Sequence, residues 1–282
     1  MKKIMFFLKI GLCAAVLQWS LSTAAIASGK IKISVSVLPQ AYFVEKIGGT
    51  RVNVQVMIPK GASPETYSPT PRQLMMLYDS KIYVKVGSPS FPFEKKHFDS
   101  ILKKHENMIV VNMSAGVKYR KGDPHVWVAP ATVKIAAVNI YKALSKIDPL
   151  NRSYYKKRLA SFLNKIERLD NEIRALLAGK KGFSFMVFHP AWGYFADEYG
   201  LNQLSIAVSG KSPSASHIKN MIDIAREKNI RIIFVQKGFD VRSAGVIADA
   251  IGGKVLPIDP LAKNWLENME DIAKILRDVL KQ

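Results

Sequence analysis

The stretch NRSYYKKRLASFLNKIERLDNEIRALLA, residues Asn151–Ala178, decides the fold. Its apolar side chains recur every three or four residues, which is the spacing of one face of an α-helix. Asp148-Pro149 precedes the stretch and Gly179 follows it, as is typical of helix ends. The segment is not rich in the Gly, Ser and Pro that make linkers flexible, so it predicts one long, stiff helix. The pattern is carried by Tyr155, Leu159, Phe162, Leu163, Ile166, Leu169, Ile173, Leu176 and Leu177.

Short β-branched runs alternate with helical patterns on both sides of this helix. Before it, the expected strands are Lys32–Leu38, Val52–Ile58, Ile82–Val86 and Met108–Asn112, and the expected helices are Tyr42–Ile47, Arg72–Tyr78 and Thr132–Ile147. After it, the expected strands are Phe183–Phe188, Gln203–Val208, Ile230–Val235 and Val255–Ile258, and the expected helices are Ala215–Lys228, Ala244–Ile251 and Leu266–Leu280.

This alternation is typical of parallel sheets covered by helices, here formed twice. We therefore predict an α/β protein of two parallel-sheet lobes joined by one long rigid helix. The expected boundaries are an N-terminal lobe over 28–148, a linker helix over 149–180 and a C-terminal lobe over 181–282. The helix is expected to pack along both lobes.

Residues 1–27 have the pattern of a cleaved export signal. Lys2, Lys3 and Lys9 are followed by a mostly apolar stretch from Ile10 to Leu21, and Ala25-Ile26-Ala27 offers a cleavage site. A lipid anchor on Cys13 is not expected, because Leu12 stands where such a signal needs a small residue. An uncleaved membrane anchor is the alternative. We expect a protein exported to a periplasmic space.

Composition excludes several classes of protein. Of the 282 residues, 48% are hydrophobic and 23% charged, as in folded soluble domains rather than disordered or fibrous chains. Beyond the N-terminus no apolar run approaches the ~20 residues that a membrane span needs. The single cysteine, Cys13, excludes a disulfide scaffold and a cysteine metal cluster.

The net charge of +20 falls to +17 when the leader, with three lysines and no acids, is removed. Such a charge permits binding to nucleic acids or anionic membranes. The basic residues are, however, spread along the chain, and the densest group, Lys156 to Arg158, lies on the predicted polar face of a helix. A solvated surface is the favoured interpretation, and no nucleic-acid partner is expected.

Two histidines and two carboxylates occupy positions where an α/β protein binds ligands. His189 ends an apolar strand, and His125 follows a polar loop ahead of a long helix. Glu65 lies in the loop after the second strand, and Asp259 directly follows the last. Side chains at the carboxyl ends of parallel strands face the ligand crevice. Two imidazoles and two carboxylates would suit Zn(II), Mn(II) or Fe(II) better than Cu(I). For each residue taken singly, a structural role is the alternative.

Four motifs in order resemble the metal-binding solute-binding proteins of ABC transporters for zinc and manganese. They are Gly61-Ala62-Ser63-Pro64-x-Thr66-Tyr67-x-Pro69-Thr70-Pro71, Asp123-Pro124-His125-Val126-Trp127, His189-Pro190-Ala191-Trp192-Gly193-Tyr194-Phe195 and Ile258-Asp259-Pro260-Leu261. The resemblance runs from about Lys32 to the C-terminus. It implies two α/β lobes bridged by a long helix, with metal held in the cleft between them.

The resemblance implies a metal site formed by Glu65, His125, His189 and Asp259. It also shows one departure, because position 65 is normally histidine in this family. The alternative for Glu65 is a side chain that turns away, with water in its place. Zn2+ is the favoured metal and Mn2+ the alternative, since zinc stands above manganese in general affinity order.

The function implied is capture of a divalent cation in the periplasm and delivery to an ABC permease in the inner membrane. We expect a monomer without enzymatic activity. One alternative is a metal-stabilised surface adhesin that uses its basic faces. Another is a metallohydrolase, which would need a general base beside a metal-bound water, and no residue stands out for that role.

Overall fold

The computed structural model describes residues 29–98, 101–102, 105, 107–207, 213–236 and 241–280. The predicted export signal, residues 1–27, lies outside them, as does Val208 at the end of an expected strand. Within the described residues no helix combines the length and the apolar character needed to cross a membrane.

The N-terminal lobe holds a four-stranded parallel sheet in the order β2-β1-β3-β4. Ile33 of β1 pairs with Val54 of β2 and with Ile82 of β3. The strands are β1 (Ile31–Val35), β2 (Val52–Val56), β3 (Ile82–Lys85) and β4 (Ile109–Asn112). The helices are α1 (Leu38–Gly48), α2 (Pro71–Tyr78), α3 (Pro92–His97) and α5 (Pro130–Ile147), with short 3₁₀ helices η1 (Gly49–Arg51), η2 (Val126–Val128) and η3 (Pro149–Asn151).

The C-terminal lobe repeats this topology, with a parallel sheet in the order β6-β5-β7-β8. Its strands are β5 (Ser184–Val187), β6 (Asn202–Ser205), β7 (Ile232–Val235) and β8 (Lys254–Pro257). Its helices are α7 (Gly193–Tyr199), α8 (Ala215–Glu227), α9 (Val241–Ala250) and α10 (Trp265–Val279). Each predicted α/β series therefore forms its own sheet.

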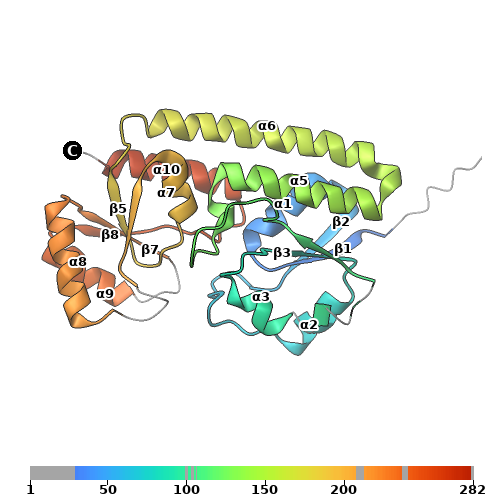
Figure 1. Ribbon diagram of the computed structural model, residues 1–282, viewed down its shortest axis with the longest axis horizontal. Helices are drawn as coiled ribbons and strands as arrows, with labels where there is room; N and C mark the ends of the chain where they lie inside the picture. Colours follow the sequence, from blue (N-terminus) through green and yellow to red (C-terminus); the bar gives the residue numbers. More distant parts are fainter. Residues whose placement is uncertain are drawn as a thin grey trace, which may run out of the picture.

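The predicted connector is α6 (Arg152–Leu176), a helix of 25 residues. In Figure 1 it runs along the top of both lobes, beside α5 on one lobe and α10 on the other. Its buried residues include Tyr155, Phe162 and Ile173, all members of the predicted apolar stripe. The expectation of two parallel-sheet lobes with a long connecting helix is confirmed.

The main hydrophobic core runs through both lobes. It includes Phe43 of α1, Phe162 of α6, Phe185 of β5 and Trp265 of α10. A second, smaller core lies under α8 and α9 and includes Met221 and Ile247. The lobes are therefore joined by packed apolar side chains as well as by the chain itself.

The first strand ends earlier and the first helix begins earlier than the sequence pattern predicts. Gln40 accounts for both, because its Oε1 accepts the backbone N–H groups of Ser36 and Val37 at 2.9 and 3.0 Å. These donors are thereby withdrawn from the sheet. Pro39 then occupies the first turn of α1, where a missing N–H carries no cost. The turn places Val37 and Leu38, just after β1, on the wall of a cavity that Asp259 also lines.

Candidate metal centre

His125 is fixed by a carboxylate two residues earlier in the chain. One oxygen of Asp123, Oδ1, accepts the backbone N–H of His125 at 2.9 Å and lies 2.8 Å from Nδ1 of its ring. Because a carboxylate accepts hydrogen bonds, Nδ1 carries the proton and the lone pair is left on Nε2. The residue is buried, just before η2 and α5.

His189 comes from the other lobe and faces His125. It follows β5 at the carboxyl edge of the sheet, where the backbone of Phe188 still bonds to Phe234 at 2.7 Å. Nε2 of His189 lies 3.2 Å from Nε2 of His125, with the rings nearly perpendicular at 80°. Two residues that are 64 positions apart therefore present the same ring nitrogen to one point.

The spacing of these nitrogens fits a bound zinc ion. Two nitrogens at 2.0–2.1 Å from one tetrahedral zinc would lie about 3.3 Å apart, close to the observed 3.2 Å. Burial, reinforced by the neighbouring His125 ring, lowers the pKa of His189 to about 3. His189 is therefore neutral across the physiological range, as a metal ligand must be.

Glu65 lies on the opposite side of the His189 ring. Its Oε1 is 3.8 Å from Nδ1 of His189, and its side chain is 38% exposed. The loop that carries it is folded by Ser63, whose backbone oxygen accepts the N–H groups of Thr66 and Tyr67 at 3.2 and 2.9 Å. In this structure the Glu65 carboxylate thus lies on the Nδ1 side of His189, as Asp123 does for His125, but at 3.8 Å it is beyond hydrogen-bond distance.

The four predicted residues line two adjoining cavities, three of them in one and Asp259 in the other. A cavity of about 530 Å³ between the lobes is lined by Glu65, His125 and His189. A second, of about 310 Å³, is lined by Asp259, whose Oδ1 accepts the backbone N–H of Leu261 at 2.8 Å. Gln236 and Leu261 line both cavities. Among the described residues no three His, Cys, Asp or Glu side chains are grouped so that they could hold a metal ion.

Asp123 and Gln236 were missed as site residues. The signal for Asp123 was present, since a carboxylate two residues before a histidine can bond to its ring. Gln236 directly follows the buried strand β7, and its own exposure is only 9%. Its position is the one at which parallel strands deliver ligand-binding side chains.

Arg120 connects Asp123 to the other lobe. Its Nε is 3.5 Å from Oδ2 of Asp123, and its guanidinium bonds to Asp197 of α7. Its backbone N–H donates to the hydroxyl of Tyr194, also on α7, at 2.9 Å. The carboxylate that orients His125 is thus held from both sides of the cleft.

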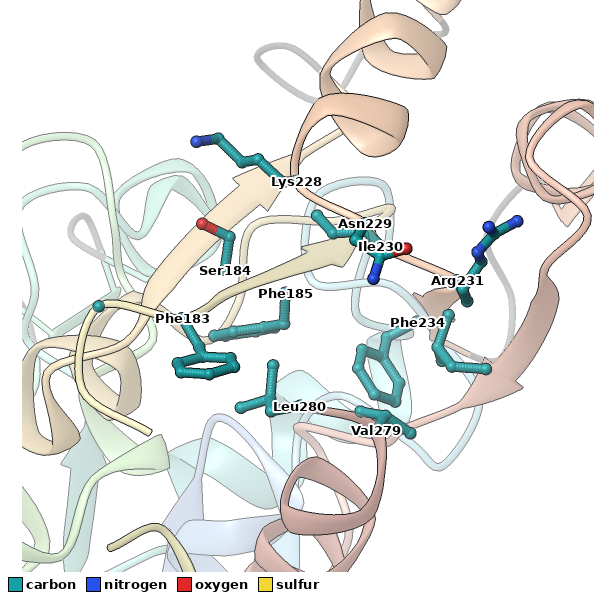
Figure 2. Close-up of a pocket in the computed structure, with 12 residues that line it drawn as sticks. Phe183, Ser184, Phe185, Lys228, Asn229, Ile230, Arg231, Phe234, Val279 and Leu280 are labelled. Atoms are coloured by element: carbon teal, nitrogen blue, oxygen red, sulfur yellow. The ribbon is translucent and has the colours of Figure 1, made fainter. Parts of the chain in front are cut away.

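A further hollow of about 310 Å³ has no metal-binding character (Figure 2). It lies at the amino ends of β5 and β7, away from the histidines, where Phe183, Phe185 and Phe234 face Val279 and Leu280 at the end of α10. None of its lining residues is a histidine or an acid. The inter-lobe cavity is therefore the candidate site.

The fold and the cavity together define a two-lobed solute-binding protein with its ligand site between the lobes. The family model for ZnuA, zinc-uptake complex component A, periplasmic, matches residues 33–279. The chain therefore belongs to the ZnuA family of solute-binding proteins.

Individual relatives agree with this assignment. The high-affinity zinc uptake system protein ZnuA of Bacillus subtilis (strain 168) is 26% identical over 90% of the chain and 85% of its own length. The zinc-binding protein AdcA of Streptococcus pyogenes serotype M3 is 27% identical over 92% of the chain, which spans 56% of AdcA. A crystal structure of ZnuA is 37% identical, with a TM-score of 0.85, over 89% of this chain and all of that one.

Proposed function

We propose that this protein captures a divalent cation, zinc in preference to manganese, and delivers it to the membrane permease of an ABC importer. The observation that carries the proposal is the pair of buried Nε2 atoms 3.2 Å apart, contributed by opposite lobes. Its relatives from Bacillus subtilis and Streptococcus pyogenes have zinc in their names, which supports zinc as the cargo.

The proposed ligand set is His125, His189, Glu65 and Asp259. The 3.2 Å between the two histidine Nε2 atoms supports their part in this set, and each carboxylate would need a local movement to join them. Glu65 is part-exposed on a loop and lines the same cavity as both histidines, so a rotation of its side chain would carry the carboxylate from Nδ1 of His189 towards the Nε2 pair. Asp259 adjoins the site across Gln236 and Leu261, which line both cavities. Two carboxylates would neutralise the charge of the cation and leave no open coordination position for catalysis.

The proposed location is the periplasm, after cleavage of the leader at Ala25-Ile26-Ala27. The basic start and apolar stretch of residues 1–21 support export, and the family consists of solute-binding proteins, which supports a transport role rather than an enzymatic one. We further propose that the protein acts as a monomer, with the inner-membrane permease as its partner.

The test is a metal titration of residues 28–282 after chelation. Zinc and manganese are each titrated against a competing chelator, with wild type compared to His189→Ala, Glu65→Ala and Asp259→Ala. Lys219→Ala, an exposed substitution on α8, is the matched control. We expect one zinc per chain, bound more tightly than manganese, with binding abolished in His189→Ala and weakened in both carboxylate variants.

The possible results separate the parts of the proposal. Wild-type affinity in Glu65→Ala would remove Glu65 from the ligand set but leave the histidine site intact. Tighter binding of manganese would change the cargo. A wild-type protein without stoichiometric metal would refute metal capture and favour the adhesin alternative.

A further inference from the structure

The turn between α5 and α6 forms a projecting corner of the N-terminal lobe, here named the Leu150 corner (residues Tyr141–Lys157). Figure 1 shows it at the end of the molecule away from the C-terminal lobe. α5 begins shortly after His125 and runs for 18 residues, or about 27 Å. Because the corner lies that far from the histidines, a partner bound to it leaves the inter-lobe cavity accessible.

The tip of the corner is an apolar side chain that is exposed to solvent. Leu150 is 95% exposed, more than any other large apolar side chain in the described part of the chain. The turn around it is well ordered by Asp148, which accepts hydrogen bonds from Nδ2 of Asn151 at 2.8 Å and from the hydroxyl of Tyr155 at 2.6 Å. Leu150 is thus presented on a fixed support.

The two helices that meet at this tip carry exposed cations on both sides of the turn. Between residues 131 and 166 the chain carries eight Lys and Arg residues and one acid, Asp148. Asp148 does not cancel the positive charge of these residues, because its own negative charge is paired with Arg51, whose Nε lies 2.9 Å from Oδ2 of Asp148. The exposed cations of the corner are Lys142, Lys146, Arg152, Lys156 and Lys157.

Two tyrosines lie on the same two helices as the cations. Tyr141 and Tyr154 are partly buried, and the side chain of Arg152 bonds to the hydroxyl of Tyr141. Tyrosine, an exposed leucine and a group of cations are typical of surfaces that enter the headgroup layer of a membrane. A soluble polyanion would use the cations but would offer no apolar medium for Leu150.

We propose that the Leu150 corner docks the protein onto an anionic phospholipid surface, with Leu150 inserted and the lysines over the headgroups. The interaction is independent of the metal site and is held by charge and by one apolar side chain. It is therefore weak, reversible and sensitive to salt.

The experiment measures co-sedimentation of residues 28–282 with phosphatidylcholine vesicles containing about one third phosphatidylglycerol. One variant replaces Lys142, Lys146, Lys156 and Lys157 with Gln. The matched control replaces four exposed lysines of the C-terminal lobe, Lys181, Lys219, Lys228 and Lys254, with Gln, so that net charge is equal. Leu150→Ser tests the apolar tip. Circular dichroism and zinc titration confirm that each variant is folded.

Each lysine near the headgroups is expected to raise vesicle affinity about five-fold. The corner variant should therefore lose at least ~100-fold in vesicle affinity, and the control variant should lose far less. Leu150→Ser is expected to lose roughly ten-fold. Equal losses in the corner and control variants would overturn the proposal in favour of non-specific attraction. The proposal would also be overturned if Leu150→Ser bound the vesicles as tightly as wild type and wild type bound strongly to a soluble sulfated polysaccharide. The corner would then be a site for soluble polyanions.

Discussion

Asp123 sets the direction in which His125 presents its metal-binding nitrogen. We expect Asp123→Asn to weaken zinc binding roughly 10- to 100-fold, because the amide no longer holds the Nδ1 proton as the carboxylate does. The measurement is competition with a chelator. Asp223→Asn, the same substitution at an exposed position of α8, is the control. Equal affinities for Asp123→Asn and wild type would show that the ring is held by packing alone.

Single residues show how far a sequence can indicate a site. His125 and His189 could be predicted because each lies in a recognisable motif and, for His189, directly after an apolar strand. Their separation could not, since it depends on how two lobes pack against each other through side chains such as Trp127 and Trp265. The position of Glu65 beside Nδ1 of His189 depends on a loop conformation for which residue spacing gives no rule.

The start of α7 is packed against the site so closely that only glycine fits. A Cβ on Gly193 would lie 2.4 Å from Oδ2 of Asp123 and 2.6 Å from Nε of Arg120. We therefore expect Gly193→Ala to displace Asp123 and weaken zinc binding by at least ten-fold. Gly245→Ala on α9 is the control, because its Cβ would meet nothing within 4 Å.

The losses from Gly193→Ala and Asp123→Asn should not add, since both act through the same carboxylate. A double variant measured in the same chelator competition tests this point. Full additivity would mean that Gly193→Ala disturbs the site by another route.

The N-terminus of α5 receives a buried carboxylate from the other lobe. Both oxygens of Glu198 accept the backbone N–H of Ala131, at 3.1 and 3.2 Å. Burial raises the pKa of Glu198 to about 7, despite the opposing effect of that hydrogen bond. The folded protein therefore binds a proton that the unfolded chain has released between about pH 4.5 and 7, and stability falls as the pH rises through this range.

The prediction is a change in the free energy of unfolding that depends on Glu198. Relative to Glu198→Gln, wild type should lose up to roughly 3 kcal/mol between pH 4.5 and 8. Urea denaturation of both proteins at several pH values checks this. Parallel pH curves for the two proteins would show that the pKa of Glu198 is the same in the folded and unfolded states.

At the scale of elements, the sequence patterns indicated the eight strands and six helices predicted outside the linker more reliably than their ends. The α6 pattern could be recognised because one face of a helix must be apolar when it packs on two lobes. The ends were set by side chains, such as Gln40 for β1 and the Thr70–Gln73 capping box for α2. Gln73 also reaches back to the carbonyl of Met57, a contact that a local pattern does not reveal.

Across the whole molecule, the lobes are tied together behind the cleft. The indole N–H of Trp265 donates to the carbonyl of Trp127 at 2.6 Å, and that of Trp127 donates to the carbonyl of Pro260 at 2.7 Å. Both indoles are buried, and Trp265 also packs edge-on against Phe43 of α1. Opening the lobes as a hinge would break buried hydrogen bonds at about 1–3 kcal/mol each, in addition to bending α6.

We therefore expect metal binding to move the lobes by less than about 2 Å. Because residues 28–282 contain no cysteine, spin labels can be attached at cysteines replacing Lys95 on α3 and Lys219 on α8. Their separation is measured with and without zinc. Trp265→Phe, which keeps an aromatic ring but removes the bond to Trp127, should broaden the distance distribution. A zinc-dependent shift of many ångströms in wild type would show that the connector bends, and that release of the metal is controlled by hinge opening rather than by local movements of the Glu65 and Asp259 side chains.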